Sequence, residues 1–323
     1  MHIVVIANPV SSRGGGLKKR ELLIRSLDTA TAGLEGQVTY QIIETKTPGQ
    51  AVQTGSLVQG SAGDLAHRAA AEGTDIVAAA GGDGTVGEVA NGLVGTNAIL
   101  GVLPMGTGND FARTLGIGTD LQLAANALVR GYSCEVDLGK ISNGGYFINV
   151  AGCGFDAEVA TRVNQGFRWV HGTMAYVVAV LQTLIRFRPT RISLVMDGAS
   201  REEIVMLCAI ANAKTYGGGM RVAPDADISD GLFDIVLVGN VSRFEFLRAF
   251  PSVFKGTHIS HPKVQVFRAS KVSISSLATM AALADGEEIG NTPVEFQIIP
   301  RAIKVICPPQ SGGALCRLCV WFQ

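Results

Sequence analysis

The first part of the chain alternates between two hydrophobic periods. Short apolar runs typical of buried strands occur at 3–7, 76–80 and 99–103, an alternating strand pattern at 38–43, and apolar residues at helical spacing at 18–27, 62–71, 86–93 and 121–128. This regular exchange of strand and helix patterns is typical of βαβ units. The sequence therefore predicts an α/β domain built on a doubly wound parallel sheet.

The pattern changes after residue 131. Strand-like runs then follow one another closely, at 135–141, 146–151, 191–196, 204–211, 233–238, 264–267, 271–275, 278–284, 294–299 and 302–306. Clear helical patterns interrupt them at 173–185 and 244–254. Many short strands separated by turn signals predict an all-β sandwich or barrel. We therefore expect an α/β domain over 1–131 and a second, β-sandwich domain over 132–307, and the tail 308–323 is left unassigned.

Two glycine-rich turns follow strand patterns in the first domain. The run 81–85 reads GGDGT and the run 106–110 reads GTGND, so each turn carries a hydroxyl and a carboxylate. Glycine lets backbone N–H groups approach a bound anion closely. One such turn is equally a tight strand-to-helix connection, but two at successive strand ends favour phosphate chemistry, with carboxylates for Mg²⁺ nearby. A P-loop sequence and a GxGxxG turn after a strand are both missing from the sequence.

Composition narrows the possible partners and the compartment. The 323 residues are 47% hydrophobic and 17% charged, and the formal net charge is zero, so no global field favours nucleic acid. The first residues have no basic leader pattern, so a cytoplasmic protein is expected. The apolar stretch 169–187 is marginal for a membrane span and is interpreted as a buried or lipid-facing helix. The six cysteines show no disulfide or zinc spacing, so reduced thiols are expected.

Three further polar segments each leave two interpretations open. Asn8 and Pro9 follow the first strand and either face the crevice of the glycine turns or form a plain turn. The segment 225–230 holds three acids, which either share a cation with backbone carbonyls or lie in a solvated loop. Asp285-Gly286-Glu287-Glu288 ends an apolar strand and supplies either a general base or an Asp-Gly hairpin turn.

Taken together, these motifs resemble the diacylglycerol kinase catalytic-domain family, in particular its soluble bacterial lipid kinases. The motifs are Asn8-Pro9, GGDGT at 81–85 with Glu88 and Asn91, PMGTGNDFAR at 104–113, Asn212-Ala213, GGGM at 217–220, APDA at 223–226 with Asp230-Gly231, HPK at 261–263 and DGE at 285–287. The resemblance runs through nearly the whole chain. It implies a nucleotide-binding α/β domain and a β-sandwich lipid domain, with ATP in the cleft between them.

The resemblance also implies roles for individual residues. The residues implied to contact ATP are Asn8, Pro9, Val10, Ser11, Ser12, Thr45, Gly82, Asp83, Gly84, Thr85, Val86, Gly87, Glu88 and Thr107. Those implied to hold Mg²⁺ are Asp227, Asp230 and the Leu232 carbonyl for a structural ion, and Asp83 and Asp110 for the catalytic ion. Glu287 is the implied proton acceptor, with Asp285 beside it. The family often has Asn where Gly87 stands, which removes one side chain near the nucleotide.

The implied function is ATP-dependent phosphorylation of a lipid hydroxyl, on diacylglycerol or a related lipid alcohol. The alternatives are a NAD kinase and a non-catalytic sensor of lipid or nucleotide; the retention of all four acids at 83, 110, 230 and 287 argues against the sensor. A lipid substrate implies peripheral membrane contact through an apolar entrance, with little dependence on salt. Glu287, just beyond an apolar strand, is expected to be partly buried. The identity of the lipid and the oligomeric state, a homodimer included, stay open.

Overall fold

The computed structural model describes residues 1–8, 16–47, 50–53, 56–165, 173–308 and 320–321. The chain divides into two compact units, and each is described here by itself. Unit 1 contains Met1–Leu138 and Pro300–Gln323, and unit 2 contains Gly139–Ile299. Unit 1 is therefore built from both ends of the chain, and unit 2 is inserted between them.

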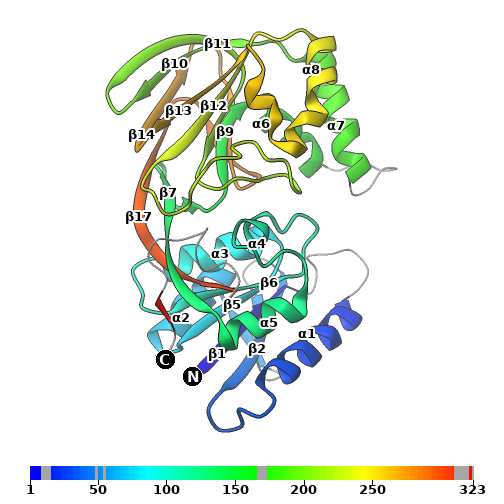
Figure 1. The fold of residues 1–323 in the computed structure, drawn as a ribbon, viewed down its shortest axis with the longest axis vertical. Coiled ribbons are helices and arrows are strands. Elements are labelled where there is room, and N and C mark those ends of the chain that lie inside the picture. Colours follow the sequence, from blue (N-terminus) through cyan, green and yellow to red (C-terminus); the bar gives the residue numbers. More distant parts are fainter. Residues whose placement is uncertain (9–15, 48–49, 54–55, 166–172, 309–319, 322–323) are drawn as a thin grey trace. The chain divides into compact units, whose positions relative to one another are not determined.

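Unit 1 is the predicted doubly wound α/β fold (Figure 1). Its parallel strands are β1 (His2–Ala7), β2 (Thr39–Thr47), β5 (Ile76–Gly81), β6 (Ile99–Pro104) and the end of β17 (Val294–Cys307), in the order β2-β1-β5-β6-β17. Its helices are α1 (Gly16–Thr31), α2 (Ala62–Ala71), α3 (Asp83–Leu93), α4 (Asp110–Thr114) and α5 (Leu121–Arg130). A small antiparallel extension follows β2, made of β3 (Gln50–Gln53) and β4 (Ser56–Gln59).

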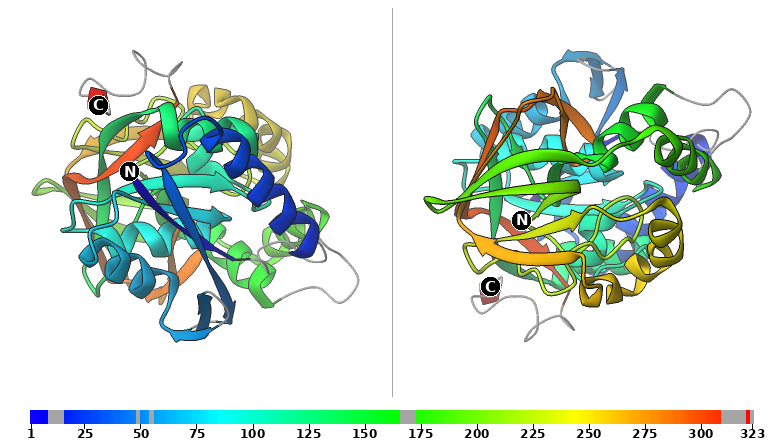
Figure 2. Two further views of the ribbon diagram at one scale, coloured as in Figure 1. Left: turned by 90° about the horizontal axis from the view of Figure 1, so that it is seen from below. Right: turned by 90° about the horizontal axis from the view of Figure 1, so that it is seen from above.

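Helices cover both faces of this parallel sheet. Figure 2 shows α1 with α5 on one face and α2 with α3 on the other, and β1 and β5 are accordingly buried along nearly their whole length. The α2–α3 contact depends on glycine, because a Cβ atom on Gly92 would lie 2.1 Å from the carbonyl oxygen of Gly63. The uniform apolar runs of these strands reflect burial on both sides.

Unit 2 is the predicted β-sandwich. One series of paired strands is β16 (Glu287–Asn291), β15 (Ala281–Ala284), β9 (Val150–Gly154), β11 (Ala199–Ala211), β12 (Phe233–Gly239) and β13 (Val264–Ala269). A second series starts from β11 and pairs it with β10 (Thr190–Met196), which pairs with β14 (Lys271–Ser276), which pairs with β17. All these pairings are antiparallel. Between the layers lies an apolar core in which Phe147 stacks on Phe233 and meets Phe296 edge-on.

Helices lie together beside the strands of unit 2 (Figure 1). They are α6 (Phe155–Gln165), α7 (Thr173–Arg186), α8 (Arg243–Ala249) and the short 3₁₀ helices η1 (Phe250–Lys255) and η2 (Thr257–Ser260). With the outer face of β11 and β12 they enclose a second apolar cluster that includes Phe155, Val236 and Phe246. The short strand β8 (Tyr146–Phe147) pairs with β7 (Tyr132–Ile141), which also pairs with β18 (Val320–Trp321).

Several elements differ from the sequence-based prediction. The helix predicted over 244–254 is α8 followed by η1, because Pro251 cannot donate the backbone hydrogen bond of a continuing α-helix. The strands predicted at 294–299 and 302–306 are one strand, β17, in which Arg301 has a φ of 52°. The sequence patterns do not predict α4, α6, β3, β4 or β16.

The division into units also differs from the predicted boundaries of 1–131 and 132–307. Strand β7 contributes residues to both units, and so does β17. Lys304 and Val305 of β17 pair with Ile99 and Leu100 of β6, so the end of the second predicted domain belongs to unit 1. The return of β17 to the sheet of unit 1 is a long-range pairing that no local pattern reveals.

Two expectations from composition concern thiols and membrane spans. Among the described residues, Cys134, Cys153, Cys208 and Cys307 are buried free thiols, in line with the expected reduced state; the remaining two cysteines lie outside the described residues. The described part of the chain contains no helix with the length and apolar character needed to cross a membrane.

Candidate functional site

The two glycine turns of unit 1 lie against each other at the carboxyl ends of β5 and β6. Gly81 pairs with Pro104 in the sheet, and the Met105 N–H donates to the Gly81 carbonyl at 2.9 Å. A Cβ atom on Gly106 would lie 2.3 Å from the Cα of Gly82. Glycine is therefore required at 106 because the two backbones touch. Open α/β sheets bind ligands at this edge.

The first turn leads directly into α3. Gly82 is the N-cap residue of this helix and makes no side-chain capping bond, and Thr85 is buried against Gly81. The first-turn N–H groups of a helix attract anions, since they lack partners within the helix and add to its dipole. The Val86 N–H, however, already donates to the Gly82 carbonyl at 3.1 Å, and the side chain of Val86 is buried. Donors for a phosphate are thus expected from the amides at 83–85.

Two carboxylates meet beside this helix start. Asp83 is half-buried and Asp110 is buried, and the Phe111 N–H donates to Asp83 Oδ1 at 3.1 Å. Burial, and then the charge of Asp110, raises the pKa of Asp83. Two acids that repel each other lie here next to backbone N–H groups that can bind an anion. This arrangement fits a bound divalent cation, whose charge would relieve the repulsion.

The second turn is held by a residue missing from the predicted site. Asn109 has a φ of 53°; its Oδ1 accepts from the Gly106 N–H at 2.9 Å, and its Nδ2 donates to the Gly106 carbonyl at 3.0 Å. Lys19, also unpredicted, donates from Nζ to the Met105 carbonyl at 2.8 Å. Asn in a left-handed conformation next to glycines is a recognisable signal, whereas Lys19 reaches the turn from α1 and gives no local one.

The other residues expected near ATP have varied surroundings in unit 1. The Asn8 N–H donates to the Ala80 carbonyl at 3.0 Å, and Thr45 Oγ1 donates to the Ala7 carbonyl at 3.3 Å, so both lie at the ends of β1 and β2 near the Gly81 turn. Thr107 is exposed. Gly84 and Gly87 lie on α3. The expected contacts at Pro9, Val10, Ser11 and Ser12 lie outside the described residues.

Glu88 has a structural contact of its own. It is exposed on α3, and its Oε2 accepts from the Ala62 N–H at 3.1 Å, which caps the start of α2. The Gly87 carbonyl accepts from Asn91 Nδ2 at 2.8 Å. A role of Glu88 at the nucleotide would therefore compete with its bond to α2.

The Asp285-Gly286 segment of unit 2 forms the hairpin turn between β15 and β16. Both residues have positive φ, 49° and 84°, as a type I′ turn requires. The Asp285 carboxylate accepts from the N–H groups of Ile148 at 2.7 Å, Asn149 at 2.8 Å and Val150 at 3.2 Å. Asp285 thus fixes the start of β9, which leaves Glu287 as the better placed of the two acids to exchange a proton.

Glu287 is exposed, so the expectation that it is partly buried is wrong. The physical reason is its position on β16, where it pairs with Ala284 of β15. Among the described strands β16 lies at an edge of unit 2, and Glu288 and Gly290 on it are also exposed. A carboxylate in water keeps its ordinary solvation, and any desolvation would require a bound substrate.

The acidic loop before β12 forms a charged cluster. Asp227 Oδ1 accepts from Ser229 Oγ at 2.8 Å, and Asp230 Oδ1 accepts from the Leu232 N–H at 3.1 Å. Arg268, which the sequence-based site did not include, forms an ion pair with Asp230. Burial, and then the charges of Asp225 and Asp227, raises the pKa of Asp234 to about 6.

This loop fits a cation only in part. Asp234 Oδ2 is buried, accepts no hydrogen bond and lies 3.7 Å from Arg268 Nε, and the carboxylates of the loop are the chemistry that attracts Mg²⁺. Asp230, an expected ligand, is already paired with Arg268, so a metal there would require that guanidinium to move. Within the described residues, no group of three or more His, Cys, Asp or Glu side chains is arranged to hold a metal ion.

Unit 2 also contains an apolar pocket that the sequence did not reveal. It lies between the outer face of β11 and β12 and the helices α6, α8 and η1, and encloses about 760 Å³ including its open mouth. Phe155, Val236, Phe246 and Phe250 are among its lining residues. The Oδ2 atom of the lining residue Asp156 is buried and accepts no hydrogen bond, and burial raises the pKa of this carboxyl to about 6. Such a pocket suits an apolar chain.

Comparisons with known proteins agree with this combination of units. The family model of the diacylglycerol kinase catalytic domain matches residues 2–141, and that of the YegS C-terminal NAD kinase beta sandwich-like domain matches residues 149–307. A diacylglycerol kinase of Mycobacterium tuberculosis is 36% identical over 317 residues, covering 95% of each chain. A diacylglycerol kinase of Bacillus subtilis is 35% identical over 79% of this chain and 86% of its own.

Solved structures show the same fold. A putative diacylglycerol kinase from Bacillus anthracis superposes with a TM-score of 0.73 at 24% identity, covering 96% of this chain and 98% of that one. The α/β fold with a β-sandwich, predicted from the sequence, is therefore confirmed. The chain belongs to the diacylglycerol kinase family. It is a lipid kinase, as the sequence predicted, and the alternative of a NAD kinase is not supported.

Proposed function

We propose that the protein transfers the γ-phosphate of ATP to the hydroxyl group of diacylglycerol or a closely related lipid alcohol. The observation that carries this proposal is the contact between the two glycine turns, with Asp83 and Asp110 beside the uncapped start of α3. Phosphoryl transfer needs backbone N–H groups that bind the phosphates and acidic side chains that hold the metal ion. The apolar pocket of unit 2 supports a lipid as the acceptor.

In this proposal unit 1 binds the nucleotide. The amides at 83–85 and the end of β1 at Asn8 bind phosphate oxygens, and Asp83 and Asp110 hold Mg²⁺. When bound, Mg²⁺ neutralises charge on the transferred phosphate and on the leaving group. Asn109 and Lys19 keep the second turn in place, so that the donors are oriented before the substrate arrives.

Unit 2 in this proposal binds the lipid and accepts its proton. The acyl chains occupy the apolar pocket, and Glu287 takes the hydroxyl proton as the lipid oxygen attacks the γ-phosphorus. Asp285 acts through position, because its bonds to three amides hold the hairpin that carries Glu287. If Arg268 moves away from Asp230, that acid would hold a structural Mg²⁺ together with Asp227 and the Leu232 carbonyl. A lipid acceptor also requires peripheral membrane contact.

Transfer of radiolabelled phosphate from ATP tests the proposal. The acceptors compared are diacylglycerol, phosphatidylglycerol, a sphingoid base and an undecaprenol-like alcohol in mixed micelles, with NAD as a further acceptor. Asp83→Asn keeps the hydrogen bond to Phe111 and is expected to lower kcat by about 10²-fold or more. Glu72→Gln, on the exposed end of α2, serves as the matched control. Equal phosphorylation of NAD, or an Asp83→Asn variant with unchanged kcat, would contradict the proposal.

A further inference from the structure

Helix α8 and the following η1 carry apolar side chains on two sides. Phe246 and Phe250 line the pocket. Phe244 and Leu247 lie three residues apart on the other side of α8, and they are 77% and 44% exposed; Phe254 of η1 is 48% exposed. Large apolar side chains grouped on one surface mark a place of contact with another apolar phase.

One of these exposed side chains, Phe254, is continuous with the pocket. The ring of Phe155 lies 4.9 Å from that of Phe246, which lies 5.5 Å from Phe250, and Phe250 lies 6.2 Å from the exposed ring of Phe254. An apolar path therefore leads from solvent along η1 into the pocket.

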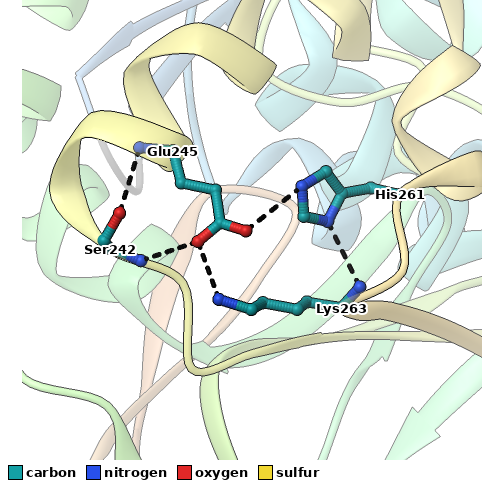
Figure 3. A network of polar contacts seen from close by, with 4 residues as sticks. All are labelled: Ser242, Glu245, His261 and Lys263. Carbon is teal, nitrogen blue, oxygen red and sulfur yellow. Dashed lines mark hydrogen bonds and ion pairs between the residues drawn. The ribbon is translucent and has the colours of Figure 1, made fainter.

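The same surface is locally cationic. Arg243, Arg248 and Lys255 are exposed, and within the described residues none of them has an ion-pair partner. The one acid of this segment is Glu245. Its charge is balanced by Lys263 Nζ at 2.7 Å and approached by His261 Nε2 at 3.5 Å, and its Oε2 also accepts from the Ser242 N–H at 3.2 Å (Figure 3).

We propose that this segment is a docking site for an anionic lipid bilayer. The site, here called the α8 surface, consists of Phe244, Leu247 and Phe254 with Arg243, Arg248 and Lys255. Its phenylalanines enter the acyl region while its cations bind lipid phosphates, as in interfacial helices. The inference rests on the proposed function, since it supplies the route by which a lipid alcohol leaves the bilayer for the pocket.

The local charge changes one expectation drawn from the whole chain. A net charge of zero predicted membrane binding that depends little on salt. Three cations without an ion-pair partner in the described part of the chain accompany these exposed rings. They predict instead that binding to anionic vesicles weakens as salt is added, while the apolar contribution persists.

Vesicle flotation with the full chain tests the α8 surface. The vesicles are phosphatidylcholine with or without phosphatidylglycerol. The double variant Phe244→Ser/Leu247→Ser is expected to lower the partition coefficient by about tenfold for both compositions. Arg243→Gln/Arg248→Gln is expected to lower it for the anionic vesicles alone. Leu277→Ser, a fully exposed leucine elsewhere in unit 2, is the matched control and should bind as the wild type does.

Activity on a short-chain, monomerically dispersed diacylglycerol separates this inference from the proposed function. If the wild type does not phosphorylate that substrate, the proposed function fails. If it does, and the serine double variant floats like the wild type, the α8 surface is wrong. Phe244→Trp is expected to bind vesicles at least as well as the wild type, which separates lost contact from misfolding. A wild type that binds neither kind of vesicle would assign the surface to another partner and overturn the inference.

Discussion

At the scale of single residues, the half-buried acid Asp285 and the buried acid Asp156 have opposite surroundings. The Asp285 carboxylate accepts hydrogen bonds from three backbone N–H groups, whereas the Oδ2 atom of Asp156 is buried in apolar surroundings and accepts none. The first arrangement stabilises the charged form and fixes a hairpin. The second makes the charged form costly. This difference between the two acids is not visible in the sequence, because the amides that bind Asp285 are up to 137 residues away.

Asp156 should therefore make stability depend on pH. Its pKa rises from 3.8 to about 6 on folding, so the folded state binds the proton more tightly than the unfolded state does. Its contribution to stability is fully present below pH 3.8 and is lost as pH rises through about 6. Asp156→Asn cannot ionise and should raise the free energy of unfolding above pH 7 by up to about 3 kcal/mol, with little effect near pH 4.

Urea unfolding across this pH range measures the effect. Glu158→Gln, exposed on the same helix, is the control and should follow the wild type at every pH. A wild type and an Asp156→Asn variant with parallel stability curves between pH 4 and 7 would show that burial does not act on this carboxyl.

The two acids of the β15–β16 hairpin should separate by their effects. Glu287→Gln removes basicity from an exposed side chain, so kcat should fall by about 10²–10⁴-fold with stability unchanged. Asp285→Asn weakens three charge-assisted bonds to the backbone and should lower the free energy of unfolding by about 1–3 kcal/mol. Initial rates and thermal unfolding of both variants measure this. An Asp285→Asn variant that is as stable as the wild type but has the low kcat expected of Glu287→Gln would show that the two roles are assigned to the wrong acids.

At the scale of elements, the sequence predicted those that are set by local pattern. The strands of unit 1 are buried on both faces, and their apolar runs are unmistakable. Helix α6 was missed because its stability comes from packing Phe155 and Val159 against the outer face of the sandwich, while most of its other residues are polar or small. The glycine turns were predicted as phosphate sites, but their mutual contact depends on sheet register.

That contact gives a sharp comparison between two neighbouring glycines. A Cβ atom on Gly106 would lie 2.3 Å from the backbone of Gly82, whereas one on Gly82 would lie 3.4 Å from Gly106, an ordinary van der Waals distance. Gly106→Ala should lower the free energy of unfolding by about 1–3 kcal/mol, since backbone must move. Gly82→Ala should leave it nearly unchanged. Thermal unfolding of the two variants measures the difference, and equal losses would mean that the turns are not in contact.

At the scale of the whole molecule, the sequence predicted two domains but not that one is inserted in the other. The return of β17 to β6 places buried Ile303, Val305 and Ile306 in unit 1. A chain ended after Ile299 should lose the fold of unit 1 and keep that of unit 2. Hydrogen exchange should show lost protection throughout unit 1, β1, β5 and β6 included, and retained protection in the strands of unit 2. A chain ended after Pro308 is the control. Retained protection of β6 in the shorter chain would contradict this.

The inserted arrangement has a consequence for synthesis on the ribosome. Every residue of unit 2 emerges before Lys304 and Val305 of β17, which pair with β6, so unit 2 can complete its strands while that edge of β6 still has unpaired backbone groups. An open edge of this kind is a template for pairing with other chains. The nascent protein thus carries a complete unit 2 and an incomplete unit 1 at the same time. We therefore expect the need for chaperones to persist until residues 304 and 305 of β17 have emerged and paired with β6.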